Sequence, residues 1–168
     1  MKRPVDFSFK LWELFNHAFR ATAKVREKEL GQYGITLSQS AVLRVALRLG
    51  KKATPAEISR QLFLEANSVS EQLRRMEADG LIKKVKDLDR KNLIRIEVTQ
   101  QGYELYRTSR ERNYIDSVMS ALTNDEKSEL WAILVKLRAQ AVKELGMDGL
   151  DLYPPSDYNE LLRPEEQD

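Results

Sequence analysis

The chain has 168 residues, a length typical of one domain. Apolar residues make up 42% of it and charged residues 32%, a balance typical of amphipathic helices in a soluble protein. The absence of cysteine excludes disulfides, zinc–cysteine sites and thiol chemistry. His17 is the single histidine, which argues against a histidine metal cluster or a histidine-based triad. We therefore expect no metal, no cofactor and no enzymatic activity.

The sequence shows no targeting or membrane signal. No apolar run approaches the roughly 18 residues that a membrane span requires. Asp6, Lys10 and Glu13 interrupt the basic-then-apolar pattern of a signal peptide. We expect a cytoplasmic protein without a membrane partner.

The net charge of +2 hides an uneven distribution. Residues 146–168 contain seven acids and one base, a charge of −6, so the remaining residues carry +8. Residues 51–95 contain eleven bases and seven acids. Such a surplus suits a polyanion such as nucleic acid, although basic surfaces also serve solubility alone. We interpret 146–168 as an acidic C-terminal extension.

Apolar residues at helical spacing predict a first helix over about 5–30, ending near Gly31–Gly34. Its apolar face comprises Leu11, Leu14, Phe15, Ala18, Phe19, Thr22 and Val25. Thr36 followed by Gln39 is a capping-box pattern that opens a second helix, which Gly50 stops.

Two closely spaced helices follow. Thr54-Pro55-Ala56-Glu57 is a strong helix start and opens a short helix with Ile58 and Leu62 as its buried pair. A fourth helix is predicted over about 66–78, and Gly80 terminates it. Its predicted buried residues are Val69, Leu73 and Met76.

The periodicity then changes to that of strands. Residues 81–85 and 93–98 predict two strands, joined by the polar segment 86–92, which makes a hairpin. In the second strand, Ile94, Ile96 and Val98 alternate with Arg95 and Glu97.

Two further helices complete the chain. Thr99 caps a long fifth helix that reaches towards Leu122. Thr123 with Glu126 is a capping box that opens a last helix. The apolar residues of this helix are Leu130, Ile133, Leu134, Leu137, Ala141 and Leu145.

A short helix, a tight connection and a second helix form a helix-turn-helix unit, whose second helix fits a DNA major groove. The residues predicted to contact base edges are Ala66, Asn67, Ser68, Ser70 and Gln72. Arg74, Arg75 and the turn at Thr54 are predicted to hold phosphates. The alternative is an ordinary amphipathic helix with a solvated polar face.

The hairpin beside this unit supplies a basic tip. Arg90 and Lys91 gain little within one chain, but on a wing Arg90 can enter the minor groove. Asp87 or Asp89 can orient its guanidinium. The alternative is that Asp89 and Arg90 merely close the turn.

These motifs resemble a known family. Asp89-Arg90-Lys91, followed by the strand and Thr99-Gln100-Gln101-Gly102, resembles the wing and helix-start signature of the MarR family, the multiple antibiotic resistance regulators. The segment Val69–Ile82 is similar to that family's recognition helix and its Leu-Glu-x-x-Gly-Leu ending. Met76 stands where leucine is usual, and Lys91 replaces the common second arginine.

The resemblance extends in element order from Leu11 to Leu145. It implies a mainly α fold with a small β-hairpin wing, acting as a homodimer on a pseudo-palindromic double-stranded DNA operator and usually repressing transcription. The expected organisation is one domain over 1–145, with the DNA-binding winged helix at about 36–99. Dimerisation helices then lie at about 5–30 and 100–145.

One physical observation and the family resemblance both indicate possible partners. The terminal helices carry more apolar surface than a helix-turn-helix core needs, which favours a dimer, the alternative being intramolecular packing. The resemblance also implies a small aromatic or anionic effector. Its candidate pocket residues are Trp12, Phe15, Phe19 and Tyr33, and the favoured alternative is that most of these aromatics are core.

We therefore predict a sequence-specific, ligand-responsive DNA-binding repressor. The first alternative is a winged-helix protein-interaction module, in which the basic hairpin meets an acidic partner. A small hydrolase is a weaker alternative, because the sequence contains no recognisable nucleophile–base pair or Gly-rich phosphate loop.

Overall fold

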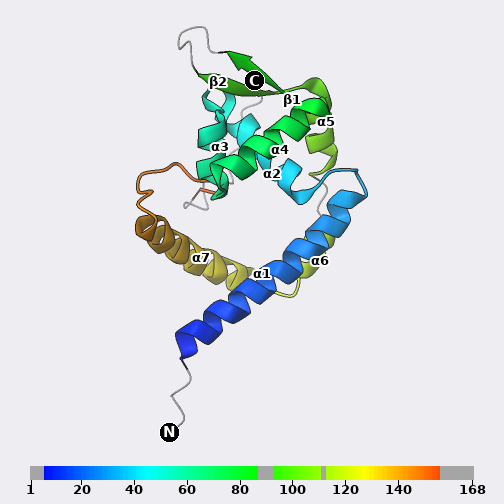
Figure 1. Ribbon diagram of the computed structural model, residues 1–168. Helices are drawn as coiled ribbons and strands as arrows, with labels where there is room; N and C mark the ends of the chain where they lie inside the picture. The colour runs from blue at the N-terminus through cyan, green and yellow to red at the C-terminus, as the bar shows by residue number, and fades with distance from the viewer. Residues whose placement is uncertain (1–5, 87–92, 111–112, 156–168) are drawn as a thin grey trace. The chain divides into compact units, whose positions relative to one another are not determined.

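The computed structural model describes residues 6–86, 93–110 and 113–155. The chain divides into two compact units, Met1–Met119 and Ser120–Asp168. The first contains α1 (Phe7–Gly31), α2 (Leu37–Leu49), the 3-10 turn η1 (Gly50–Lys52), α3 (Pro55–Leu62), α4 (Ala66–Ala78), β1 (Ile82–Lys86), β2 (Ile94–Val98), α5 (Gln100–Thr108) and α6 (Asn113–Met119). The second contains α7 (Asn124–Glu144). The predicted mainly helical fold with a hairpin wing is confirmed (Figure 1).

The predicted helix starts are confirmed by their caps. The Thr36 hydroxyl accepts a hydrogen bond from the Gln39 amide at 3.1 Å, and the Gln39 side chain accepts one from the Thr36 amide at 2.9 Å. The Thr54 hydroxyl accepts from the Glu57 amide at 3.2 Å, with Pro55 in the first turn. These bonds satisfy amides that have no partner inside the helix. Local sequence therefore fixes where α2 and α3 begin.

The core of the first unit lies among α2, α3, α4 and the hairpin, which Figure 1 shows grouped together at one end of α1. The predicted stripe of α4 and Ile58 of α3 are fully buried, whereas Leu62 is only partly buried. The other large buried apolar side chains of this core are Leu30, Ile35, Val42, Leu43, Val45, Leu81, Ile82 and Ile96. None of the helices in the three described ranges is long and apolar enough to cross a membrane.

The two strands form the predicted antiparallel hairpin, with Ile82 opposite Val98 and Lys86 opposite Ile94. The middle of β2 is anchored because the Ile96 amide donates a 2.7 Å hydrogen bond to the carbonyl of Ala53, just before α3. Among the alternating apolar residues of β2, Ile96 is buried but Ile94 is 44% exposed. Two residues along a strand span about 6.6 Å, which carries Ile94 beyond the helices that cover Ile96.

The predicted long helix from Thr99 to Leu122 is wrong, because α5 ends at Thr108 and α6 begins at Asn113. The Arg26 side chain of α1 donates to the Ser109 carbonyl at 2.5 Å. The buried Glu29 carboxylate accepts from the Tyr114 amide at 2.8 Å and is paired with Arg26. Side chains of α1 therefore satisfy backbone groups on both sides of the break, which lets two helices replace one.

The Thr99–Gly102 motif joins α5 to the end of α4. The Thr99 hydroxyl donates to the Gly80 carbonyl at 2.6 Å and accepts from the Gly102 amide at 3.0 Å. A Cβ atom added at Gly102 would lie 2.1 Å from the backbone oxygen of Leu81. Glycine is required here by the close approach of two backbones, since real Cβ atoms do not come within 3.0 Å of another heavy atom.

We expect Gly102→Ala to lower the free energy of unfolding by about 2 kcal/mol or more, because the added methyl group forces the two backbones apart. The matched control is Gly31→Ala, whose new Cβ meets no atom within 4 Å, so stability should change by less than about 1 kcal/mol. Urea unfolding followed by circular dichroism at one protein concentration measures both. Equal midpoints for the two variants would contradict the steric argument.

Candidate nucleic-acid interface

The connection between α3 and α4 is a three-residue turn that sets the predicted helix-turn-helix. Phe63 caps α3 in the left-handed conformation, with φ at 53°, and its amide donates to the Arg60 carbonyl at 3.2 Å. The Leu64 amide donates to the Ser59 carbonyl at 3.1 Å, while the Ser59 hydroxyl donates to the Leu64 carbonyl at 2.5 Å. A left-handed phenylalanine costs about 1 kcal/mol, which these contacts offset. The turn thus brings α4 to the surface of the lobe.

Helix α4 buries one stripe and exposes the opposite one. At 100° per residue, the direction opposite the buried Val69, Leu73 and Met76 is centred on Asn67 and Glu71. Arg74 and Arg75 flank this centre. Among the predicted base-contacting residues, the structure places these on the exposed surface of α4: Ala66, Asn67, Ser68 and Ser70. Gln72 is only half-exposed, with its amide nitrogen 4.0 Å from the Met76 sulfur.

An ion-pair cluster that the sequence analysis did not single out occupies the middle of this exposed face. Arg74 donates to both carboxylate oxygens of Glu71, from Nε to Oε2 at 3.0 Å and from Nη2 to Oε1 at 2.9 Å. Arg75 donates from Nε to Oε1 at 3.0 Å. These hydrogen bonds, first from Arg74 and then from Arg75, lower the pKa of Glu71 to about 2. The i,i+3 and i,i+4 spacing of an acid and two bases was the available signal.

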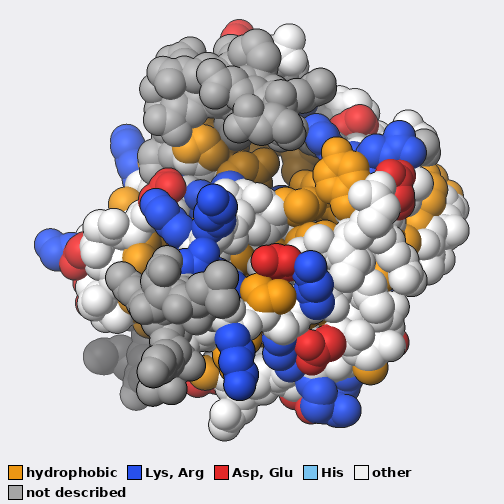
Figure 2. Space-filling model, turned by 90° about the horizontal axis from the view of Figure 1, so that it is seen from above, with side chains coloured by type: hydrophobic (Ala, Val, Ile, Leu, Met, Phe, Trp, Pro, Cys, Tyr) orange, Lys and Arg blue, Asp and Glu red, His pale blue; other side chains and the backbone are white. Residues whose placement is uncertain are grey.

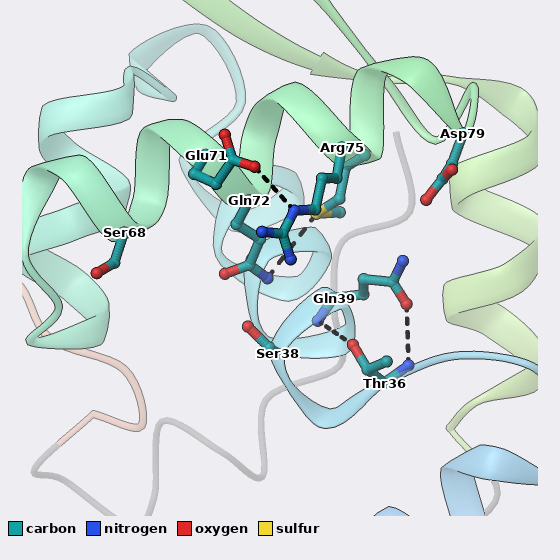
Figure 3. Close-up of a pocket in the computed structure, with 9 residues that line it drawn as sticks. Thr36, Ser38, Gln39, Ser68, Glu71, Gln72, Arg75 and Asp79 are labelled. Atoms are coloured by element: carbon teal, nitrogen blue, oxygen red, sulfur yellow. Dashed lines mark hydrogen bonds and ion pairs between the residues drawn. The ribbon is translucent and has the colours of Figure 1, made fainter.

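A groove of about 530 Å³ runs between α4 and the start of α2 (Figure 3). Ser68, Gln72 and Arg75 line it from α4, while Ser38 and the capping box line it from α2. Glu71 also lines the groove, so the ion-pair cluster and the groove share Glu71 and Arg75. The predicted phosphate contact at Thr54 lies elsewhere, on the half-exposed cap of α3.

The face seen in Figure 2 carries Lys and Arg side chains in several groups, with acidic side chains among them. Two lysines of β1 are paired: Lys83 with Glu97 at 2.9 Å and Lys84 with Glu77 at 3.0 Å. Hydrogen bonds from Lys84 lower the pKa of Glu77. The predicted wing residues Arg90 and Lys91 lie outside the described residues. The described surface is thus of mixed charge rather than uniformly basic.

The four predicted effector residues do not come together within one chain. Trp12, Phe15 and Phe19 are all exposed along α1, with the Trp12 ring 5.6 Å from that of Phe9. Tyr33 follows the far end of α1 and packs against the core. At 1.5 Å per residue, about 30 Å of helix separates Trp12 from Tyr33, more than a small ligand spans.

Comparison with known proteins agrees with this architecture. A family model described as the MarR family matches residues 33–91, from the start of α2 into the hairpin. The chain is 25% identical over 138 residues to YsmB of Bacillus subtilis strain 168, described as an uncharacterized HTH-type transcriptional regulator, with 81% of this chain and 94% of that protein covered.

Solved structures show the same fold. The organohalide-sensing transcriptional regulator RdhR, in its 2,4-dichlorophenol-bound form, is 28% identical with a TM-score of 0.78, over 92% of this chain and 95% of that one. A mutant of MarR from Escherichia coli, complexed with operator DNA, is 18% identical with a TM-score of 0.73, over 81% and 99%. The chain thus has the winged helix-turn-helix fold of these regulators, and its residues 33–91 match the MarR family.

Proposed function

We propose that the protein is a homodimeric, sequence-specific DNA-binding regulator that represses transcription from a pseudo-palindromic operator and responds to a small ligand. The observation that carries this proposal is the exposed polar face of α4, held outward by a fully buried stripe on its other side. A helix presented in this way fits a major groove about 12 Å wide. Asn67, Ser68 and Ser70 then face base edges.

Phosphate contacts fix the position of such a helix on the duplex. Arg74 and Arg75 are exposed, and within the described residues they give two and one N–H groups, respectively, to Glu71. A guanidinium carries five N–H groups, so each arginine can keep this contact and also reach a phosphate. Arg90 of the wing supplies the proposed minor-groove contact.

The apolar face of α1 supports the proposed dimer. Leu14 is 65% exposed and Phe19 is 63% exposed, and Leu11 and Phe15 lie on the same face. A continuous apolar stripe of this kind marks an interaction surface, and a two-fold axis lets one stripe cover its copy. In the second unit, α7 likewise exposes Ile133 and Leu137. Two recognition helices on one duplex follow from such pairing.

We expect Leu14→Glu to convert the protein from a dimer to a monomer, because a dimer would bury the new carboxylate among apolar side chains. His17→Glu is the matched control, since it introduces the same group at an exposed position about 120° or more around the helix from the centre of the stripe. Sedimentation velocity measures the mass of each. A monomeric wild-type protein, or a dimeric Leu14→Glu variant, would rule out this interface.

We expect Arg90→Ala to weaken binding to a duplex from the protein's own upstream DNA and to flatten the salt dependence of log K by about 0.9, one phosphate-equivalent. Lys24→Ala, which removes an exposed cation from α1, is the control and should leave both unchanged. Fluorescence anisotropy titrations at about 50 to 200 mM salt measure the affinity and its salt dependence, because phosphate contacts make affinity fall steeply over this range. An unchanged slope removes the wing from the interface, and no binding in dilute buffer favours the protein-interaction alternative.

The proposed effector is a small aromatic molecule, which the dichlorophenol-bound relative supports. The exposed Trp12 follows Leu11 of the stripe on α1 and offers a reporter. We expect 2,4-dichlorophenol to quench Trp12 fluorescence saturably and to lower the affinity for DNA. A Trp12→Phe variant retains only Trp131 and identifies the signal. Linear, non-saturating quenching with unchanged DNA affinity would contradict this ligand class.

A further inference from the structure

Glu71 stands at an unusual place for an acid, near the centre of the face that α4 would turn towards DNA. A carboxylate in a major groove faces phosphate repulsion on both sides. It is tolerated only where it accepts hydrogen bonds from base donors or from basic side chains. Its lowered pKa shows that Glu71 remains ionised, so it acts as an acceptor only.

The geometry leaves Glu71 one acceptor position. An ionised carboxylate has about four lone-pair sites. Oε1 already accepts from Arg74 and from Arg75, whereas Oε2 accepts only from the Arg74 Nε atom within the described residues. Oε2 therefore retains room for one further donor. The bidentate Arg74 contact fixes the plane of the carboxylate and so the direction in which that position points.

The major-groove edges of the bases decide which donor fits. Guanine presents two acceptors and thymine an acceptor with a methyl group, all unfavourable for a carboxylate. Adenine presents an amine beside the N7 acceptor, which repels the second oxygen. Cytosine presents its N4 amine alone, and its guanine partner presents acceptors that suit a guanidinium. A carboxylate held between two arginines therefore matches a cytosine·guanine pair.

We propose that Glu71 is a specificity-determining residue, which accepts a hydrogen bond from the N4 amine of a cytosine at the centre of each half-site. One of Arg74 and Arg75, still bonded to Glu71, donates to the paired guanine, while the other keeps the proposed phosphate contact. This inference rests on the proposed DNA-binding function and adds the base pair that α4 selects. Glu71 also positions the two arginines, so its loss affects more than one contact.

The test is selection from a pool of duplexes with a randomised central segment, using the full-length protein. We expect the wild-type protein to enrich a two-fold symmetric motif with cytosine at one position in each half-site. Glu71→Gln should lose that cytosine and gain adenine there, because glutamine makes two hydrogen bonds to adenine. The remaining positions should not change.

Two further variants separate readout from charge and folding. Glu71→Asp keeps the charge but shortens the side chain, so it should lose the cytosine preference while binding DNA overall. Glu77→Gln, which removes an ion-paired acid from another side of the same helix, should select the wild-type motif. Replacing the selected cytosine in one half-site should weaken wild-type binding about tenfold but that of Glu71→Gln less than threefold.

The outcomes distinguish this inference from the proposed function. A wild-type motif that Glu71→Gln and Glu71→Asp both select unchanged overturns the role of Glu71 and leaves DNA binding intact. A wild-type motif without cytosine at a central position does the same. If the wild-type protein enriches no motif, the proposed function fails, and the inference fails with it.

Discussion

One-sided burial of α4 is the constraint on which the rest of the lobe depends. Val69, Leu73 and Met76 are fully buried, and each contributes about 2 kcal/mol by leaving water. Because all three lie on one stripe, the opposite face stays exposed without loss of stability. The three-residue turn at Phe63 sets where α4 begins, and the Gly80–Thr99–Gly102 junction holds its end. The side chains on the exposed face of α4 can therefore change without moving the helix, because the buried face fixes its position.

A second constraint is the polar clamp between α1 and the α5–α6 junction. A buried carboxylate such as Glu29 is costly unless it is paired and fully hydrogen-bonded. Here Arg26 pairs with it, and the Tyr114 amide donates to it. Lys28 lies over the Tyr114 ring at 5.7 Å, and the Gln32 side chain donates to the Tyr114 hydroxyl at 3.0 Å. The C-terminal part of α1, beyond the proposed dimer stripe, is thus joined to the helices that follow the wing.

Local patterns predicted most of the fold because the interactions concerned are local. Capping oxygens three residues from their amides fixed the starts of α2, α3 and α7, and the stripe of α4 was read from spacing alone. The division of the long helix escaped prediction because residues 103–122 contain neither glycine nor proline. The side chains that bond the backbone on each side of the break, Arg26 and Glu29, are more than 80 residues away in sequence. The sequence showed which aromatic side chains α1 carries, but not that Trp12 and Tyr33 lie about 30 Å apart along one chain.

In the proposed function, the two exposed faces of the first unit depend on each other. A single α4 offers a few polar side chains and a carboxylate, and one such helix discriminates few base pairs. Doubling the reading surface on a rigid pair makes the second contact intramolecular, which raises affinity without any new contact. An apolar stripe such as that of α1 marks a surface for a partner, and duplication of the recognition face would increase the number of base pairs read. The proposed pairing through α1 would satisfy both requirements at once, so loss of that dimer should abolish sequence preference before it abolishes general attraction to DNA.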